Sequence, residues 1–307
     1  MDVILAGYLE EIALLFEIET PPDFSFRETL LAHGWRSLAP FYWSEETQAL
    51  IRVEQLEDGL TTRLTITEGQ HCLRIETSHI VEVEKLIPRV ETMFQLNLPL
   101  TRFYDFCGQR SELHLIPTRK QGRMLCSPTL WEDCCKVILT TNTTWSQSVA
   151  MTKRFVQAYG SPLDTSPAEK AFPTPEAVAE VPFAAFESTA RFGYRNQSVH
   201  TLATAIAEGS LDLEQLRDNR LTSAEVWKQL LKIRGVGPYA ASCLMIYMGR
   251  YERVNVDSWA RMLVGRQVGN TVTDREVHQF FEPYGEWSGI VYHFYPWRAD
   301  EPLEVST

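Results

Sequence analysis

The chain has 307 residues, of which 44% are hydrophobic and 22% charged, so it can bury a core divided among two or three subdomains. Asp2 stands where a secretory signal peptide carries basic residues, and no segment approaches the roughly 18 uncharged apolar residues of a membrane span, so we expect a cytoplasmic protein with no membrane contact. The net charge of −11 argues at first against a polyanionic partner.

Alternating apolar and polar residues predict β-strands over residues 49–56, 61–67 and 71–77, separated by Gly-containing and polar turns. From about Val81 onward, apolar residues recur every three or four positions, which is typical of helices. The residues between Ser161 and Pro182 include five prolines and are interpreted as an ordered or semi-ordered connector, not a disordered linker. This pattern predicts an α+β fold, a small antiparallel sheet followed by helices. The helical segments are 83–96, 129–141, 146–160, 198–209, 223–234, 240–250, 257–266 and 275–285.

The cysteines and histidines show no metal-binding pattern. Six cysteines in a chain of this length do not form a disulfide scaffold, and no C-x-x-C or H-E-x-x-H spacing occurs. We therefore expect reduced, mostly buried thiols, no catalytic metal and no cofactor. The cysteines are Cys72, Cys107, Cys126, Cys134, Cys135 and Cys243.

The charge is unevenly distributed. Residues 1–100 carry seven basic and 17 acidic side chains, whereas residues 119–160 and residues 232–266 each carry six basic and two acidic ones. Binding to nucleic acid depends on cations that displace condensed counterions. The two basic segments are therefore compatible with a polyanionic partner, despite the negative net charge of the chain.

The second basic segment contains the most informative motif, I-R-G-V-G-P-Y. Ser223 is a plausible N-cap for a helix that runs through Ile233, Gly235 can take the left-handed conformation that ends it, and Gly237-Pro238 can begin a second helix. Two helices joined in this way form a helix-hairpin-helix, in which Gly235, Val236 and Gly237 leave backbone N–H groups free for a phosphate. An ordinary αα-hairpin is the alternative interpretation.

The hairpin lies in a longer pattern that resembles the helix-hairpin-helix DNA glycosylase superfamily. "L-x-x-I-R-G-V-G-P-Y-A-A" followed by "V-N-V-D" matches the signature of that superfamily, and the resemblance extends from Leu130 to Trp297. It is similar to 8-oxoguanine DNA glycosylases and to bacterial 3-methyladenine glycosylase II. The resemblance implies a small sheet domain over residues 1–98, and over residues 99–307 two mostly α-helical subdomains with the active-site cleft between them.

The resemblance assigns the catalytic role to Asp257. Cleavage of an N-glycosidic bond builds positive charge on the deoxyribose, which a carboxylate can stabilise while it helps to activate water. The alternative is that Asp257 only caps the helix that begins at Ser258. Both roles are compatible, because the aspartate of the family sits at a helix start.

Tyr239 departs from the bifunctional members of the family, which carry a lysine at this position that forms a Schiff base. A phenol cannot form an imine, and neither Lys228 nor Lys232 matches the lysine position. The resemblance therefore implies a monofunctional glycosylase that uses water and leaves an abasic site without β-lyase cleavage. Tyr239 is interpreted either as a base-stacking residue or as part of the core.

Other positions match the parts of the family that extrude and hold a base. Asn142 matches the gap-filling position, and Tyr194 and Arg195 match residues that wedge beside the unpaired partner base and contact it, with helix caps or surface polar groups as the alternative. An arginine expected near the wedge is Gln147 here, which argues against a strict requirement for cytosine opposite the lesion.

The predicted base pocket is formed by Tyr239, Cys243 and His293, although Cys243 is equally expected from core packing. The glutamine that reads an oxidised purine in 8-oxoguanine glycosylases is Gly289 here, and their stacking phenylalanine is His293. These departures argue against recognition of 8-oxoguanine in the usual way, and the pocket is compatible with a cationic alkylated purine or with another lesion entirely.

Two classes of function follow from this interpretation. The first is a monomeric DNA glycosylase of base excision repair that flips a damaged base from double-stranded DNA, with alkylated purines as lead substrates and oxidised, deaminated or mismatched bases as the alternative. The second is a protein of the same fold that binds lesions without catalysis. The enzyme would be cytoplasmic, and nucleoid-associated in a bacterium.

Overall fold

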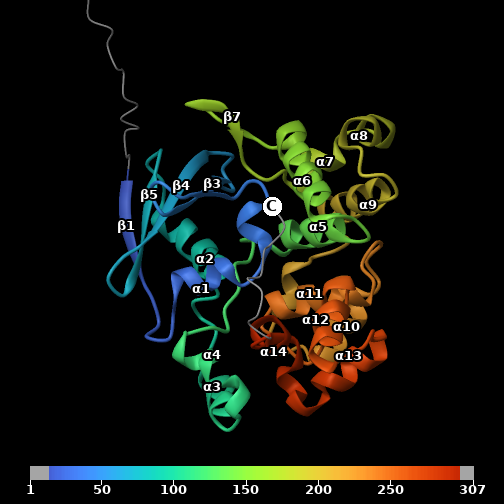
Figure 1. Ribbon diagram of the computed structural model, residues 1–307. Coiled ribbons are helices and arrows are strands. Elements are labelled where there is room, and N and C mark those ends of the chain that lie inside the picture. Colours follow the sequence, from blue (N-terminus) through green and yellow to red (C-terminus); the bar gives the residue numbers. More distant parts are fainter. Residues whose placement is uncertain (1–13, 298–307) are drawn as a thin grey trace, which may run out of the picture.

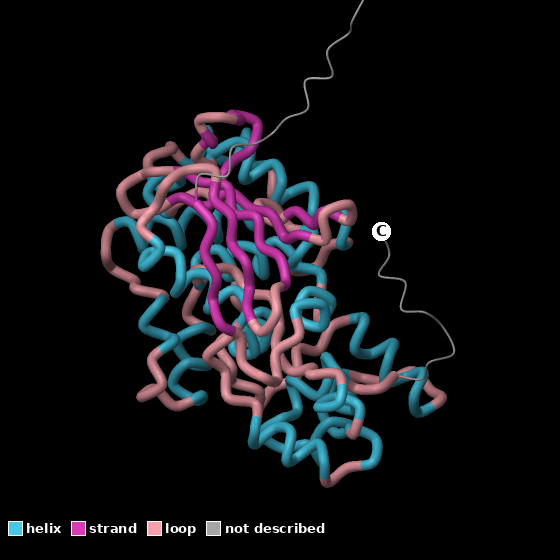
Figure 2. Tube along the Cα trace, turned by 90° about the vertical axis from the view of Figure 1, so that its left-hand side faces the viewer, coloured by secondary structure: helices cyan, strands magenta, loops and turns pink. Residues whose placement is uncertain are grey.

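The computed structural model describes residues 14–297 and confirms the α+β architecture (Figure 1). The first 13 residues, on which the absence of a signal peptide was argued, lie outside the described residues. Five antiparallel strands form the N-terminal sheet in the order β1-β5-β4-β3-β2 and run side by side in Figure 2. Their bounds are β1 (Leu14–Glu19), β2 (Tyr42–Ser44), β3 (Ala49–Gln55), β4 (Thr61–Glu68) and β5 (Cys72–Thr77).

Helices α1 to α4 lie close to the sheet or below it in Figure 1. The later helices form two groups, with α5 to α9 beside the sheet and α10 to α14 below them in this view. The buried core is continuous from Ile18 to Phe294, and the domain boundary at residue 98 stays a prediction. No helix in residues 14–297 is long and apolar enough to cross a membrane. The bounds are α1 (Phe26–Leu31), α2 (Val83–Phe94), α3 (Thr101–Gly108), α4 (Leu115–Thr118), α5 (Leu130–Thr140), α6 (Trp145–Tyr159), α7 (Pro175–Ala179), α8 (Phe183–Ala190), α9 (Arg195–Ala207), α10 (Ser223–Leu230), α11 (Pro238–Tyr247), α12 (Ser258–Val268), α13 (Asp274–Phe281) and α14 (Ser288–Phe294).

Each helical segment expected from the sequence contains a helix, but one helix cap was wrong. Thr222, not Ser223, is the N-cap of α10, where its hydroxyl accepts from the Glu225 N–H and Glu225 reaches back in a capping box. Helix α10 ends at Leu230, short of the expected Ile233. The proline-rich connector is ordered, as expected, and folds into a hairpin of β6 (Pro162–Leu163) and β7 (Ser166–Lys170) followed by α7.

Helix α5 joins the sheet to the helical part through buried ion pairs. Glu132 accepts from Arg52 of β3 at 3.0 and 3.2 Å and from Lys136 at 2.7 Å. Burial alone would raise the pKa of Glu132, but Arg52 and Lys136 lower it to about 2. Because these charges are paired and hydrogen-bonded, the polar face of β3 can be covered by a helix.

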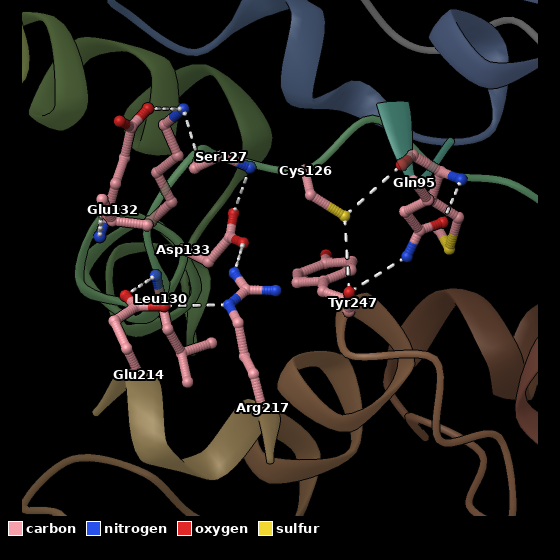
Figure 3. Close-up of polar contacts among 12 residues, drawn as sticks. Gln95, Cys126, Ser127, Leu130, Glu132, Asp133, Glu214, Arg217 and Tyr247 are labelled. Carbon is pink, nitrogen blue, oxygen red and sulfur yellow. Dashed lines mark hydrogen bonds and ion pairs between the residues drawn. The ribbon is translucent and has the colours of Figure 1, made fainter. Parts of the chain in front are cut away.

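A second contact of α5 involves Asp133, which lies between Ser127 and Arg217 in Figure 3. Its carboxylate accepts from the Ser127 N–H and from the Trp35 indole N–H, both at 2.9 Å. Trp35 belongs to the N-terminal part of the chain and Arg217 to the stretch before α10. The Arg217 guanidinium lies 3.8 Å from the Asp133 carboxylate. Asp133 therefore holds two distant segments, those of Trp35 and Arg217, at the N-terminal end of α5.

The C-terminal end of α11 is also tied to the N-terminal part (Figure 3). The Gln95 amide donates to the carbonyl of Tyr247 at 3.0 Å and accepts from the Met124 N–H at 2.8 Å. These bonds fix α11, which carries two of the predicted pocket residues, against residues close to the sheet.

The first basic segment is less exposed than its charge suggests. Lys136 is fully buried in the ion pair with Glu132, and the Arg123 guanidinium is 2% exposed and paired with Asp23 at 3.0 Å. Two of the six positive charges in residues 119–160 are therefore paired inside the molecule, while Arg119, Lys120 and Lys153 are exposed. All six cysteines are free and buried, as expected.

Candidate active site and DNA-binding surface

The predicted hairpin is present between α10 and α11. Gly235 has φ +87°, and a Cβ at this position would lie 2.6 Å from the Ser198 hydroxyl oxygen of α9, so conformation and close packing both require glycine. Gly237 is the N-cap of α11, and Pro238 occupies the first turn. The expected turn conformation of the two glycines is confirmed. The expectation of a free N–H at Val236 is wrong, because this group donates to the Ile233 carbonyl at 3.0 Å and closes the turn.

The start of α11 faces open space. A Cβ at Gly237 would meet no atom within 4 Å, and the backbone N–H groups of Gly235 and Gly237 have no hydrogen-bond partner within residues 14–297. Lys232 and Arg234, in the turn before them, are exposed. Free amides at a helix start with cations beside them form an arrangement that suits an anionic backbone.

Asp257 is the N-cap of α12, and its Oδ1 accepts from the Ala260 N–H at 2.8 Å. The predicted capping role is thus confirmed. The side chain is partly buried, and burial raises its pKa above the ordinary value of 3.8 in spite of the N–H groups at the helix start. A carboxylate with a raised pKa is a better proton acceptor than an exposed aspartate.

Tyr239 and Cys243, one turn apart on α11, lie close to Asp257. Their side chains share a hydrogen bond, and the proximity of Cys243, together with burial and the charge of Asp257, raises the pKa of Tyr239 well above its ordinary value. Burial raises the pKa of Cys243 to about 12. Both groups are therefore neutral at physiological pH, and the Asp257 carboxyl lies beside them.

His293 of α14 completes the cluster. Its Nε2–H donates to the Asn255 side-chain oxygen at 3.1 Å, and burial lowers its pKa to about 4. The structure thus brings together Tyr239, Cys243, Asp257 and His293, which the sequence analysis had grouped through the family resemblance.

Three further residues lie at this cluster that the sequence patterns did not identify as site residues. Asn255 orients His293 and hydrogen-bonds Cys243, and Tyr292 lies close enough to Asp257 for the carboxylate to raise its pKa, after the larger effect of burial. His33 stacks on Tyr247, and burial, helped by His293, lowers its pKa to about 3. Asn255 and Tyr292 adjoin predicted residues, which is a usable signal, but nothing in the sequence around His33 points to α11.

Gly289 stands where 8-oxoguanine glycosylases carry a glutamine, and it is closely packed. Its N–H donates to the Tyr251 carbonyl at 2.7 Å, and a Cβ there would lie 2.4 Å from the carbonyl oxygen of Arg253. Helix α14 therefore packs against backbone at this position, and a side chain has no room.

Gly289→Gln should accordingly lower the free energy of unfolding by about 1–3 kcal/mol, because the new Cβ overlaps a backbone carbonyl. Urea denaturation measures the change. Gly108→Gln is the matched control, because a Cβ at Gly108 meets nothing within 4 Å. Equal stability of the two variants would contradict the close packing of α14.

Asn142, Tyr194 and Arg195, the predicted wedge residues, also lie together. The Asn142 side-chain amide donates to the Tyr194 hydroxyl at 3.3 Å, and Tyr194 is 64% exposed. Arg195 is only 7% exposed and donates to backbone carbonyls of Thr141 and Asn142. Gln147, at the position of the second arginine, is exposed and accepts from the Thr143 hydroxyl.

The class of helix-hairpin-helix DNA glycosylases is defined by a helix-hairpin-helix and a partly buried aspartate at the start of the next helix. This chain has both features, together with a small N-terminal antiparallel sheet. The model of the HhH-GPD superfamily of base excision DNA repair proteins matches residues 135–289. The chain belongs to this superfamily, and DNA glycosylase is its enzyme class.

Three known proteins show the range of its relatives. A DNA-3-methyladenine glycosylase of Bacillus subtilis is 25% identical over 223 residues, which cover 70% of this chain and 72% of that protein. The 3-methyladenine DNA-glycosylase of Archaeoglobus fulgidus has the same fold, with a TM-score of 0.71 at 17% identity over 91% of this chain and 97% of the other. The 8-oxoguanine glycosylase/lyase of Clostridium acetobutylicum, solved with double-stranded DNA, gives a TM-score of 0.68 at 19% identity over 92% and 97% of the two chains.

Proposed function

We propose that this chain is a monofunctional DNA glycosylase that extrudes alkylated purines from duplex DNA and hydrolyses their N-glycosidic bond. The observation that carries the proposal is Tyr239, an aromatic side chain beside Asp257 where the bifunctional enzymes need an amine. Lys228 and Lys232 are exposed on α10 and in the turn that follows it. The relative in Bacillus subtilis, a 3-methyladenine glycosylase, supports the same substrate class.

Hydrolysis would use Asp257 in two ways. Its carboxylate stabilises the positive charge that develops on the deoxyribose as the base departs, and its raised pKa helps it to accept a proton from the attacking water. N3- and N7-alkylated purines already carry a positive charge, so the departing base needs little protonation. Neutral aromatic and imidazole groups, such as Tyr239 and His293, can accept a cationic base without charge repulsion.

The substrate is tested by incubating the protein with duplex DNA treated with a methylating agent and separating the released bases by chromatography. We expect release of methylated purines and abasic sites that break only after alkali treatment. Release of 8-oxoguanine or of mismatched bases alone would support the alternative substrates. Tight binding to an abasic analogue without release of any base would support the non-catalytic alternative.

The hairpin glycines would bind the phosphate backbone. Gly237→Val should weaken binding to damaged and undamaged duplexes alike by about five- to tenfold, through the loss of roughly one phosphate hydrogen bond. The backbone at Gly237 is extended, and its Cβ direction is open, so valine fits the free protein but obstructs a phosphate. Fluorescence anisotropy measures the affinity, and Gly237→Ala should show a smaller loss. Unchanged affinity in a folded Gly237→Val variant would mean that the hairpin is only a turn.

A further inference from the structure

Asn142 lies in a short loop, residues 141–144, that joins α5 to α6 and is called the wedge loop below. Asn142 has φ +46°, in the left-handed region that non-glycine residues avoid. Such a conformation costs of order 1 kcal/mol or more and persists only where neighbouring groups hold it. If a gap-filling side chain is already held in its bound conformation, DNA binding does not have to supply the entropy cost of ordering it.

The Arg195 guanidinium supplies the strongest contacts to this loop. Its Nε–H and one terminal NH₂ group both donate to the Thr141 carbonyl, the former at 3.1 Å, and the same NH₂ group donates to the Asn142 carbonyl at 3.2 Å. The other NH₂ group donates to the carbonyl of Phe192 at 3.3 Å. Arg195 is 7% exposed and its donors are directed at main-chain oxygens, so its hydrogen bonds are formed in the free protein, without DNA.

Tyr194 behaves differently from its neighbour. Its ring lies 4.4 Å from the Arg195 guanidinium carbon, so the cation covers one part of the ring, while 64% of the residue stays exposed. Its hydroxyl contacts Thr141 and the Asn142 side chain. Tyr194 is thus free to contact DNA, whereas Arg195 faces the wedge loop.

The first turn of α9 connects the wedge loop to the hairpin. Arg195 begins this helix, and Ser198, one turn later, packs against Gly235 so closely that a Cβ there would lie 2.6 Å from its hydroxyl oxygen. Helix α9 packs beside α5, the helix that leads into the wedge loop (Figure 1). One rigid turn therefore sets the distance between the hairpin glycines and the wedge loop.

We propose that Arg195 is a positioning residue, which holds Asn142 in its gap-filling conformation and at a set distance from the hairpin, and does not read the partner base. This proposal rests on the proposed function for its DNA context but makes its own claim about the free protein. It predicts that the contribution of Arg195 to lesion binding is the same for every partner base.

The first test needs no DNA. Arg195→Ala and Arg195→Lys are compared with wild type by hydrogen–deuterium exchange of the amides in residues 141–144. Both variants should exchange faster by roughly tenfold, because a lysine keeps the charge but cannot reproduce the fork of donors. Arg191→Ala is the matched control, since Arg191 is exposed and its side chain donates to the carbonyl of Ser188, on its own helix, and to no group of the wedge loop. Wild-type exchange in Arg195→Ala would overturn the proposal.

The second test uses four duplexes that carry a tetrahydrofuran abasic analogue opposite A, C, G or T. Arg195→Ala and Arg195→Lys should lose about tenfold in affinity on all four and little on undamaged duplex, because the gap-filling residue is no longer preorganised. A loss confined to one partner base, or full affinity in Arg195→Lys, would overturn the positioning role. Whether wild type prefers the analogue over undamaged duplex tests the proposed function separately, and the exchange result stands in either case.

Discussion

Asp257→Asn should lower base excision by roughly 100-fold or more while binding to duplex DNA stays nearly unchanged. Asparagine is as good an N-cap as aspartate, so α12 should keep its first turn and the stability should change by only a few tenths of a kcal/mol. What is lost is the negative charge near the sugar and the group that accepts a proton from water. Single-turnover rates of base release on methylated DNA measure the effect.

The matched control is Asp274→Asn, which removes one carboxylate from the first turn of α13, where it pairs with Arg261 at 2.6 Å. This variant should excise at the wild-type rate. Because burial raises the pKa of Asp257, excision by wild type should decline, as pH falls, at a pH above the ordinary aspartate value of 3.8. Near-normal turnover in Asp257→Asn would remove the catalytic assignment.

Tyr239→Lys should convert a protein that forms no covalent adduct with DNA into one that does. Borohydride traps an imine between an amine and the opened sugar, and wild type offers a phenol beside Asp257. A lysine at this partly buried position should have a lowered pKa and be partly unprotonated at neutral pH. Gel analysis after borohydride treatment of a methylated duplex measures the adduct, and wild type should give only an alkali-labile site.

Two further variants test whether the covalent adduct depends on the introduced amine and on release of the base. Tyr239→Phe should form no adduct, and Tyr239→Lys combined with Asp257→Asn should form far less than Tyr239→Lys alone, because the base must still be released first. Efficient trapping by wild type that survives replacement of both Lys228 and Lys232 would show that another amine does the chemistry, and the monofunctional assignment would then be wrong.

The sequence by itself determined the features that depend on local order. Strands β3 to β5 and helices α2, α5, α6 and α9 to α13 followed from the period of their apolar residues, whereas the short helices α1, α3, α4, α7, α8 and α14 were not predicted. The hairpin followed from Gly235 and Gly237, because φ and capping preferences act within a few residues. The position of Asp257 directly before α12 was likewise predicted from neighbouring residues alone. The catalytic role predicted for Asp257 came from the family resemblance, because its position in the sequence is explained equally well by a helix cap alone.

Only the tertiary structure decided what covers each polar side chain. Lys136 and Arg123 count as positive charge in the sequence, yet ion pairs with Glu132 and Asp23 hold them inside. The three-residue strand β2 is too short to show alternation, and β1 forms through pairing with β5.

The same limit applies at the candidate site. His33 reaches α11 through stacking on Tyr247, a contact across more than 200 positions of the chain. Arg195 was expected to face DNA, and the structure directs its donors to the carbonyls of Thr141 and Asn142. A periodic pattern predicts which face of a helix or strand is buried, but not which distant segment packs against that face. The contacts of His33 and Arg195 depend on that tertiary packing.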